Sequence, residues 1–153
     1  MKEIQLTQGK VTLIDDEDYK VLSNYNWCYH KKDGAVTRNL GTIIKLHRVI
    51  IKTPKGMEVD HINGNKLDNR KENLRICTHS ENMKNTKIKR VNNTSGYKGV
   101  SKHRNKWVTM ISNTLGDTEY VGIFQNKIDA AHAYDIEAKK RFGKFARLNF
   151  TEE

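Results

Sequence analysis

The sequence predicts an α+β protein composed of two small modules, and three observations lead to this prediction. Short β-branched and aromatic segments recur between turn residues, which is typical of strands. Only two segments combine a capping residue with a helical pattern. At 153 residues, 36% hydrophobic and with a mean hydropathy of −0.80, the chain favours two modest cores over one large core. We expect a β-rich module at 1–88, a basic linker at 89–96, and a three-stranded antiparallel sheet packed on one helix at 97–150.

The first 50 residues predict short strands at KVTLI, NWCYH and TIIKLHRVII, with turn signals at Gly9, Asp33-Gly34 and Gly41. The acidic segment DDEDY between the first two predicts a turn or a single helical turn. Two cysteines, Cys28 and Cys77, form no C-x-x-C pair. Their spacing argues against a zinc finger and a disulfide framework, and favours small buried side chains.

Residues 57–85 predict the order strand, loop, strand, helix. MEVDHI and NLRIC are the expected strands, and Asn63-Gly64 predicts a tight turn between them. Thr78 and Glu81 have the spacing of a capping box, so a helix should begin with Thr78 as its N-cap. Asn82 then lies on the first turn of that helix.

Asp60, His61 and Asn82 together suggest hydrolytic chemistry. In an ideal strand Asp60 and His61 point to opposite faces, so a distortion would be needed for both to address one site. The carboxylate of Asp60 and the amide oxygen of Asn82 suit a hard cation, Mg²⁺ or Mn²⁺, better than Zn²⁺. His61, with an ordinary pKa near ~6.5, can act as a neutral base on water at pH 7. The pattern predicts metal-assisted phosphodiester hydrolysis.

The stretch from His47 to Asn85, with LHR, DHINGNKLDNRKENLR and SEN, resembles the HNH family of nucleases, whose active site is a ββα-metal fold. The resemblance implies that His61 is the general base and Asp60 a metal ligand. It also implies that Asn73 holds the loop through hydrogen bonds to the backbone.

Two alternatives remain within this resemblance. Asn82 takes the position of the second metal ligand, where many relatives have His. His79, one helical turn earlier on the same face, is the competing ligand, and we favour Asn82. For His47 we expect a packed side chain or one that bonds a loop.

The remaining segments predict the second module. YKGVSKH, KWVTMIS and EYVGIF are the three expected strands. Asn126 should cap a helix, with Asp129 at the box position and Gly143 just beyond the C-terminal end. Its apolar stripe, at three- and four-residue spacing, can cover a sheet; it consists of Ala131, Tyr134, Ala138 and Phe142.

Residues 95–150, with SGYKGVSKHRNKWVTMI, YVGIF and the AHAYD and LNF segments, resemble the APETALA-type (ethylene-response-factor) DNA-binding domain. The resemblance implies that the sheet lies in a DNA major groove with the helix behind it. Lys98 and Ser101 stand where plant members are rich in Arg, and this departure argues against strong guanine readout. For Trp107 the alternative is a core or edge residue. The implied DNA-facing positions are Lys98, Ser101, His103, Arg104, Lys106, Trp107, Thr109 and Tyr120.

The net charge of +10 is concentrated in one segment, because residues 84–106 hold eight lysines and arginines and no acidic residue. This segment is a candidate phosphate-binding surface, and the alternative is a solvated linker.

Taken together, the patterns predict a small HNH endonuclease with an appended APETALA-type module, like those of phages and mobile elements. We expect one divalent ion, Mg²⁺ or Mn²⁺, double-stranded DNA as partner, no other small-molecule cofactor and a monomer. No apolar stretch approaches 18 residues and no signal peptide opens the sequence, so we expect a soluble intracellular protein without a membrane partner. The first alternative is a non-catalytic DNA-binding protein that keeps the HNH fold as scaffold. An RNA-binding protein is a third reading and rests on charge alone.

Overall fold

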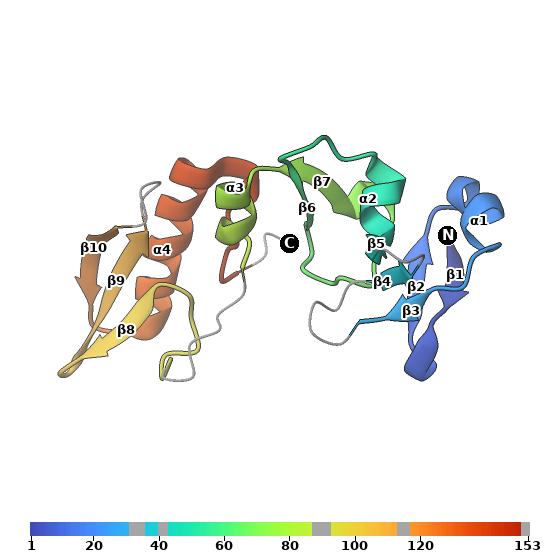
Figure 1. The fold of residues 1–153 in the computed structure, drawn as a ribbon. Helices are drawn as coiled ribbons and strands as arrows, with labels where there is room; N and C mark the ends of the chain where they lie inside the picture. Colours follow the sequence, from blue (N-terminus) through green and yellow to red (C-terminus); the bar gives the residue numbers. More distant parts are fainter. Residues whose placement is uncertain (31–35, 40–42, 87–92, 113–116, 151–153) are drawn as a thin grey trace. The chain divides into compact units, whose positions relative to one another are not determined.

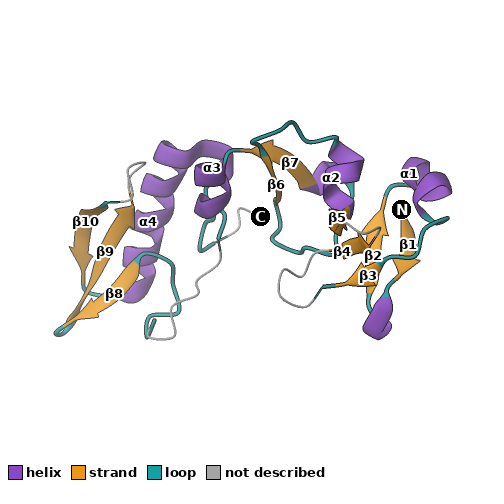
Figure 2. Ribbon diagram, in the orientation of Figure 1, coloured by secondary structure: helices purple, strands orange, loops and turns teal. Residues whose placement is uncertain are grey.

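A computed structural model describes residues 1–30, 36–39, 43–86, 93–112 and 117–150. The chain divides into two compact units, Met1–Asn82 and Met83–Glu153. Small antiparallel sheets and a few helices make up both units (Figures 1 and 2). The predicted mixture of α and β structure is therefore confirmed. None of the helices in the described ranges is long and apolar enough to cross a membrane.

In the described residues, the first unit consists of paired short strands, the helices α1 and α2, and most of α3, whose last two residues belong to the second unit. β1 pairs with β2, β3 and β5 flank β4, and β6 pairs with β7, all antiparallel. In chain order the elements are β1 (Lys2–Gln5), β2 (Val11–Ile14), α1 (Asp16–Leu22), β3 (Cys28–Tyr29), β4 (Val36–Asn39), β5 (Ile43–Lys45), α2 (Leu46–Ile51), β6 (Glu58–His61), β7 (Leu74–Cys77) and α3 (His79–Lys84), with short 3₁₀ turns at Thr7–Gly9 and Lys71–Asn73.

Two sequence predictions for this unit were wrong. The segment TIIKLHRVII was expected to be one strand, but only β5 is extended and α2 follows it directly. Leu46 and Ile50 are one helical turn apart, so a helix lets the buried Leu46 and the partly buried Ile50 pack on one face against the hydrophobic cluster. The DDEDY segment is longer than a single turn, because α1 continues to Leu22, which is buried in the same cluster.

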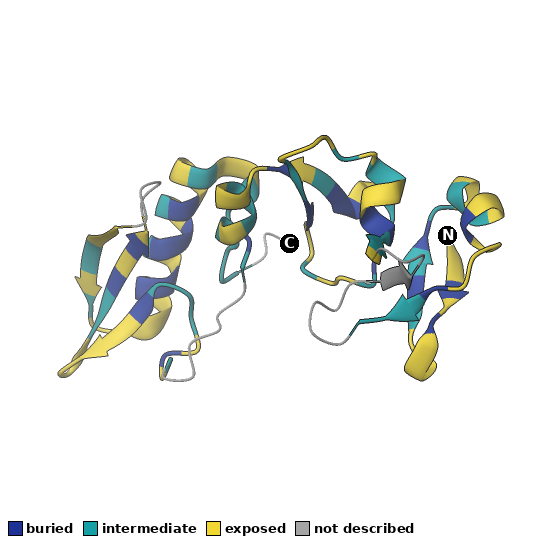
Figure 3. Ribbon diagram, in the orientation of Figure 1, coloured by how far each residue is buried: buried dark blue, intermediate teal, exposed yellow. Residues whose placement is uncertain are grey.

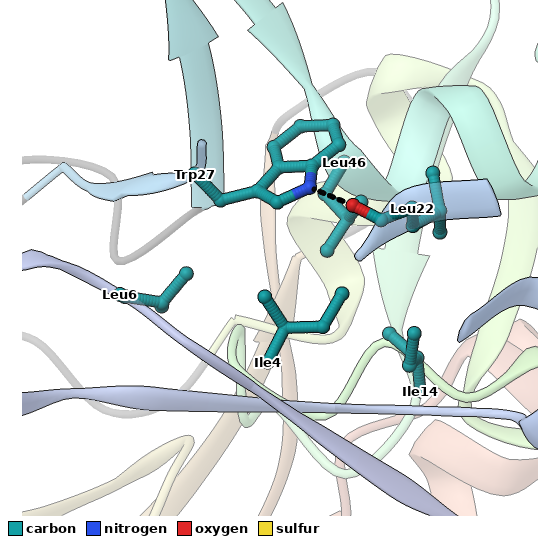
Figure 4. Close-up of a cluster of buried hydrophobic side chains, with 6 residues drawn as sticks. All are labelled: Ile4, Leu6, Ile14, Leu22, Trp27 and Leu46. Carbon is teal, nitrogen blue, oxygen red and sulfur yellow. Dashed lines mark hydrogen bonds between the residues drawn. The ribbon is translucent and has the colours of Figure 1, made fainter. Parts of the chain in front are cut away.

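The hydrophobic core of the first unit joins the N-terminal hairpin to α1 and α2. Figure 4 shows the six buried side chains, and the indole Nε1 of Trp27 donates a hydrogen bond to the carbonyl oxygen of Leu22 at 2.8 Å. The members are Ile4, Leu6, Ile14, Leu22, Trp27 and Leu46. Since Leu46 belongs to α2, this core fixes the helix that carries His47.

The N-terminal hairpin also contacts the loop between β6 and β7. The amide of Leu13 donates to the carbonyl of Leu67, and the amide of Asn69 donates to the carbonyl of Leu13, both at 2.8 Å. Leu13 and Asp68 form a parallel β-bridge. The first residues of the chain therefore brace the loop that follows Asp60 and His61.

The second unit is a three-stranded antiparallel sheet with a helix along one face (Figures 1 and 3). Its strands are β8 (Val100–His103), β9 (Lys106–Ser112) and β10 (Thr118–Phe124), in the order β10-β9-β8. α4 (Lys127–Phe142) starts at the predicted cap, where Asn126 Oδ1 accepts from the amides of Ile128 and Asp129. The buried hydrophobic residues between helix and sheet are Val100, Ile111, Ala130, Ala131, Tyr134 and Ala138.

A hydrogen-bond network connects the two ends of this unit, and residues of the AYD and LNF segments form it. The carboxylate of Asp135, in α4, accepts from the backbone amides of Asn149 at 2.8 Å and Phe150 at 2.9 Å. The side-chain amide of Asn149 in turn bonds both the N–H and the C=O of Lys98. These residues hold the C-terminal segment against the start of the sheet.

Candidate active site

The strand–loop–strand–helix unit forms as predicted. β6 and β7 pair in regular antiparallel register, with Asp60 opposite Arg75 and His61 opposite Leu74. Thr78 and Glu81 make the expected capping box, in which the Thr78 hydroxyl accepts from the Glu81 amide at 3.2 Å and the Glu81 carboxylate accepts from the Thr78 amide at 2.7 Å. The strand distortion considered for Asp60 and His61 is not found, because the register runs through both residues without a shift.

The carboxylate of Asp60 is buried and paired with a cation from the neighbouring strand. Its Oδ2 accepts from Arg75 Nε at 2.8 Å and from Arg75 Nη2 at 2.5 Å. The side chains of both residues are largely shielded from solvent. In this structure the candidate metal ligand is therefore held by a guanidinium group.

Glu58 lies on the same face of β6 as Asp60, and the sequence motif did not indicate it as a site residue. Its Oε2 accepts from the side-chain nitrogen of Asn82 at 2.5 Å, and its Oε1 lies 2.8 Å from Nδ1 of His79. These two hydrogen bonds, that of Asn82 first, lower the pKa of Glu58. The two alternative metal ligands of α3 are thus connected through one carboxylate.

His61 is buried at the end of β6, with 6% of its surface exposed. Its Nε2 lies 3.1 Å from Oδ1 of Asn69, a residue of the loop. Burial lowers the pKa of His61, and the Asn69 hydrogen bond and the nearby Asp60 carboxylate only partly oppose this effect. The imidazole is therefore neutral at pH 7, as a general base requires.

His47 packs against His61 as a buried neighbour in α2. The two rings meet edge to face with centroids 5.2 Å apart. Burial lowers the pKa of His47 to about 3, so this ring is neutral too. A packed role, one of the two expected for this residue, agrees with this position.

Asn73 closes the loop between the two strands. Its Oδ1 accepts from the backbone amide of Asn63 at 2.9 Å, and its Nδ2 donates to the backbone carbonyl of Asp68 at 2.7 Å. Within the loop, Asn63 Oδ1 accepts from the amide of Asn65, and Asn63 Nδ2 donates to Asp68 Oδ2. Asparagine side chains thus form hydrogen bonds with backbone groups of the loop that have no strand or helix partner.

The donor chemistry of this region fits a hard divalent cation. Asp60, Glu58 and Asn82 offer carboxylate and amide oxygens, which Mg²⁺ and Mn²⁺ prefer. Within the described ranges, no three His, Cys, Asp or Glu side chains form a cluster that could hold an ion. For Asp60 to bind a cation, the Arg75 guanidinium must share its carboxylate or move away.

The structure corrects three positions of the DNA-facing set predicted for the second unit, Thr109, Trp107 and Lys98. Thr109 is fully buried and its hydroxyl donates to the Ala130 carbonyl of α4 at 2.7 Å, so it faces the helix and is not available to DNA. Trp107 is on the same side of β9 and packs against the cluster beneath α4, which agrees with its alternative as a core residue. Strand alternation accounts for both, since positions 107 and 109 share one face.

Lys98 precedes β8, and its ammonium group donates to the Lys84 carbonyl at 2.5 Å. Burial lowers the pKa of Lys98 to about 8. Because the ammonium group is partly buried and already donates to a carbonyl, it is a poor surface contact for phosphate. The other predicted positions are exposed on the sheet or its first turn; these are Ser101, His103, Arg104, Lys106 and Tyr120. The face of the sheet that points away from α4 is called the outer face. The exposed Met110 and Ile123 also lie on it, as cross-strand neighbours of Tyr120 and Val108, respectively.

Comparison with known proteins assigns this geometry to a family. A model of the HNH endonuclease family matches residues 45–84, the segment from the end of β5 to the end of α3. The uncharacterized HNH endonuclease L560 of Acanthamoeba polyphaga mimivirus is 30% identical over 148 residues, which cover 93% of this chain and 76% of that protein. The chain belongs to the HNH endonuclease family.

Two further relatives are similar to this HNH endonuclease. A putative HNH homing endonuclease, YosQ, derived from the SPbeta prophage of Bacillus subtilis, is 32% identical over 140 residues, 88% of this chain and 73% of that protein. Protein 3.8 of Escherichia phage T7 is 46% identical over 56 residues, 35% of this chain and 46% of that protein. As a member of the family, the protein is a nuclease with DNA as its substrate.

The geometry adds three residues that sequence reasoning missed in this HNH endonuclease. Glu58 precedes Asp60 by two positions, and that spacing on a strand is a signal that could have indicated it. Arg75 and Asn69 carry no comparable signal, because their partners depend on strand register and loop conformation.

The buried His47 leads to a prediction about acid stability. Its pKa of about 3 in the folded chain lies below the value near ~6.5 of an unfolded histidine, so unfolding takes up a proton. Above pH 6.5 the buried His47 does not reduce the free energy of unfolding. As the pH falls below this value that free energy decreases, by about 2 kcal/mol at pH 5 from His47 alone. Denaturant unfolding of the first unit should show this loss, and His47→Phe should reduce it.

The matched control for this experiment is His103→Gln, which removes an exposed histidine of the second unit. It should leave the pH dependence of the first unit unchanged. Trp27 fluorescence in a Trp107→Phe background would follow the first unit. A His47→Phe chain with the pH dependence of the natural sequence contradicts the prediction.

Proposed function

We propose that this HNH endonuclease, acting as a monomer, hydrolyses phosphodiester bonds of double-stranded DNA with His61 as general base and a divalent ion held by Asp60 and Asn82. The observation that carries the proposal is the buried, neutral His61 beside Asp60, at the end of a strand matched by the family. Asn73 keeps the intervening loop in position. The viral and prophage relatives support a phage or mobile-element setting.

In the proposed reaction His61 accepts a proton from a water molecule as the oxygen attacks phosphorus. Its neutral ring can do this at pH 7, since burial disfavours the charged form. When bound, Mg²⁺ or Mn²⁺ would neutralise charge on the phosphate and on the leaving oxygen. Asp60 and Asn82 supply only part of its shell, so affinity for the ion alone should be weak.

Glu58 supports Asn82 over His79 as the second ligand. Glu58 accepts a hydrogen bond from Nδ2 of Asn82, so the amide oxygen of Asn82 points away from the Glu58 carboxylate. That oxygen is then available as a metal ligand. His79 also contacts Glu58, but 77% of its side chain is exposed. An ion held in the half-buried position of Asn82 is better shielded from competing water.

The first prediction from this proposal concerns His61. His61→Ala should reduce metal-dependent cleavage by about 10²–10⁴-fold, because the general base is lost, while DNA affinity stays near that of the natural sequence. Nicking of supercoiled plasmid and a filter-binding titration measure the two quantities. Equal loss of binding and cleavage would show a folding role instead.

The pH dependence of cleavage tests the same assignment. Because burial lowers the pKa of His61, the ring stays neutral below the ordinary value near ~6.5. Cleavage should therefore persist at pH 6.5 and fall only at more acid pH. A fall centred above pH 7 would contradict a buried base.

The choice of metal ligand can be decided with two substitutions on α3. Asn82→Ala should abolish cleavage, whereas His79→Ala should leave most of it. Asn82→Asp should retain part of the activity because an oxygen donor is kept. Titration of cleavage with Mn²⁺ would show whether a variant needs more ion. The reverse order of the two alanine variants would assign the ligand to His79.

We further propose that the outer face of the β8–β10 sheet binds duplex DNA, as the APETALA-type resemblance implies. The support is a set of exposed side chains on one face and turn, with cations at Arg104 and Lys106 and an aromatic ring at Tyr120. Lys and Arg pair with phosphate, and exposed apolar groups such as Met110 can contact thymine methyls.

A matched pair of lysines tests the sheet surface. Lys106→Ala should weaken binding to all DNA sequences alike and reduce the log–log salt slope by about one. Lys140→Ala, on the exposed side of α4, removes the same charge and should change neither. Tyr120→Ala should alter preference between sequences. Equal effects of the two lysine variants would assign binding to overall charge.

A further inference from the structure

We infer that Asn69, held by Thr12 of the N-terminal hairpin, is a positioning residue that fixes the tautomer and ring orientation of His61. Thr12 lies in β2, outside the residues 45–84 that match the family. The inference rests on the proposed role of His61 as general base.

The direction of the hydrogen bonds follows from a backbone carbonyl. Leu67 C=O can only accept, so the Thr12 hydroxyl, 2.8 Å away, donates to it. The oxygen of Thr12 then accepts from the side-chain nitrogen of Asn69, also at 2.8 Å. The same nitrogen lies 3.4 Å from the carbonyl of Lys66, a second group that can only accept. Because Thr12 Oγ1 and the Lys66 carbonyl both act as acceptors here, the side-chain nitrogen of Asn69 must face them. The side-chain oxygen of Asn69 therefore faces His61.

This arrangement determines which nitrogen of His61 carries the proton. Asn69 Oδ1 lies 3.1 Å from His61 Nε2, and an amide oxygen can only accept. In the neutral ring Nε2 therefore carries hydrogen and Nδ1 carries the lone pair. During hydrolysis an O–H bond of water breaks and its proton forms an N–H bond at Nδ1, while the water oxygen forms a bond to phosphorus. The P–O bond to the leaving strand breaks, and the leaving oxygen takes up a proton from solvent. Nε2–H remains bonded to Asn69 throughout.

Thr12, Asn69 and His61 form a hydrogen-bond relay, and burial favours one orientation of the Asn69 amide within it. Thr12 is fully buried and Asn69 is 1% exposed. A reversed Asn69 amide would place its oxygen against two acceptors and its nitrogen against Nε2–H, leaving buried groups unsatisfied. The backbone bonds between Leu13 and the loop keep the three side chains together. The N-terminal hairpin thus acts on the base through Asn69.

The test uses the full-length chain with Thr12→Val, which keeps the side-chain volume and removes both hydrogen bonds of the hydroxyl. Nitrogen-15 NMR of the His61 ring should show the Nε2–H tautomer in the natural sequence and a mixture with Nδ1–H in the variant. The kcat for plasmid nicking should fall by at least about 10-fold, with little change in KM. The loss should not exceed the about 10²–10⁴-fold loss expected when the base itself is removed. Thr12→Ser should restore both readouts.

Ile14→Val is the matched control, since it trims another fully buried residue of β2. It should leave the tautomer and kcat unchanged. An unchanged tautomer in Thr12→Val overturns the relay even if cleavage falls, because lost stability alone would then explain the effect. An Nδ1–H spectrum in the natural sequence also overturns it. Cleavage by His61→Ala would instead overturn the base assignment, so the two failures are distinct.

Discussion

The docking of the N-terminal hairpin on the loop between β6 and β7 is the constraint on which the candidate active site depends. Leu13 exchanges backbone hydrogen bonds with Leu67 and Asn69, and Thr12 reaches the same loop through its side chain. Without this support, the loop would be held only by its own internal hydrogen bonds and at its two ends. The hydrophobic cluster that holds the hairpin also includes Leu46 of α2, so His47 and His61 are brought together by the same core.

Asparagine suits this loop because one neutral side chain both donates and accepts. Asn73 accepts from Asn63 near the start of the loop and donates to Asp68 in its middle. Asn69 likewise donates to Thr12 and accepts from His61. A carboxylate could not donate, and a buried charge would require a counter-ion. The concentration of asparagines in a lysine-rich chain therefore reflects the need to satisfy buried backbone without adding charge.

Two carboxylates on one face of β6 are held by protein groups. Arg75 neutralises Asp60, while Glu58 orders Asn82 and His79. Separating the buried Arg75–Asp60 pair without replacing the cation would leave an uncompensated charge, which is costly. In the proposed function a divalent ion at Asp60 would supply that replacement, either in exchange for Arg75 or by sharing the carboxylate with it. The sequence motif alone gives no indication of this competition.

The sequence by itself determined β6, β7 and α3, the capping box at Thr78 and the family, because these depend on local pattern and on residues close together in the chain. It misassigned the segment around His47 as a strand, since the buried Leu46 and the partly buried Ile50 come to pack on one helical face only in the folded core. It also placed Thr109 on the wrong face of the sheet. Tertiary structure alone decided that face, the Arg75 pairing and the contact between Thr12 and Asn69, which are 57 residues apart. Such contacts depend on register and docking, and no local pattern records either of them.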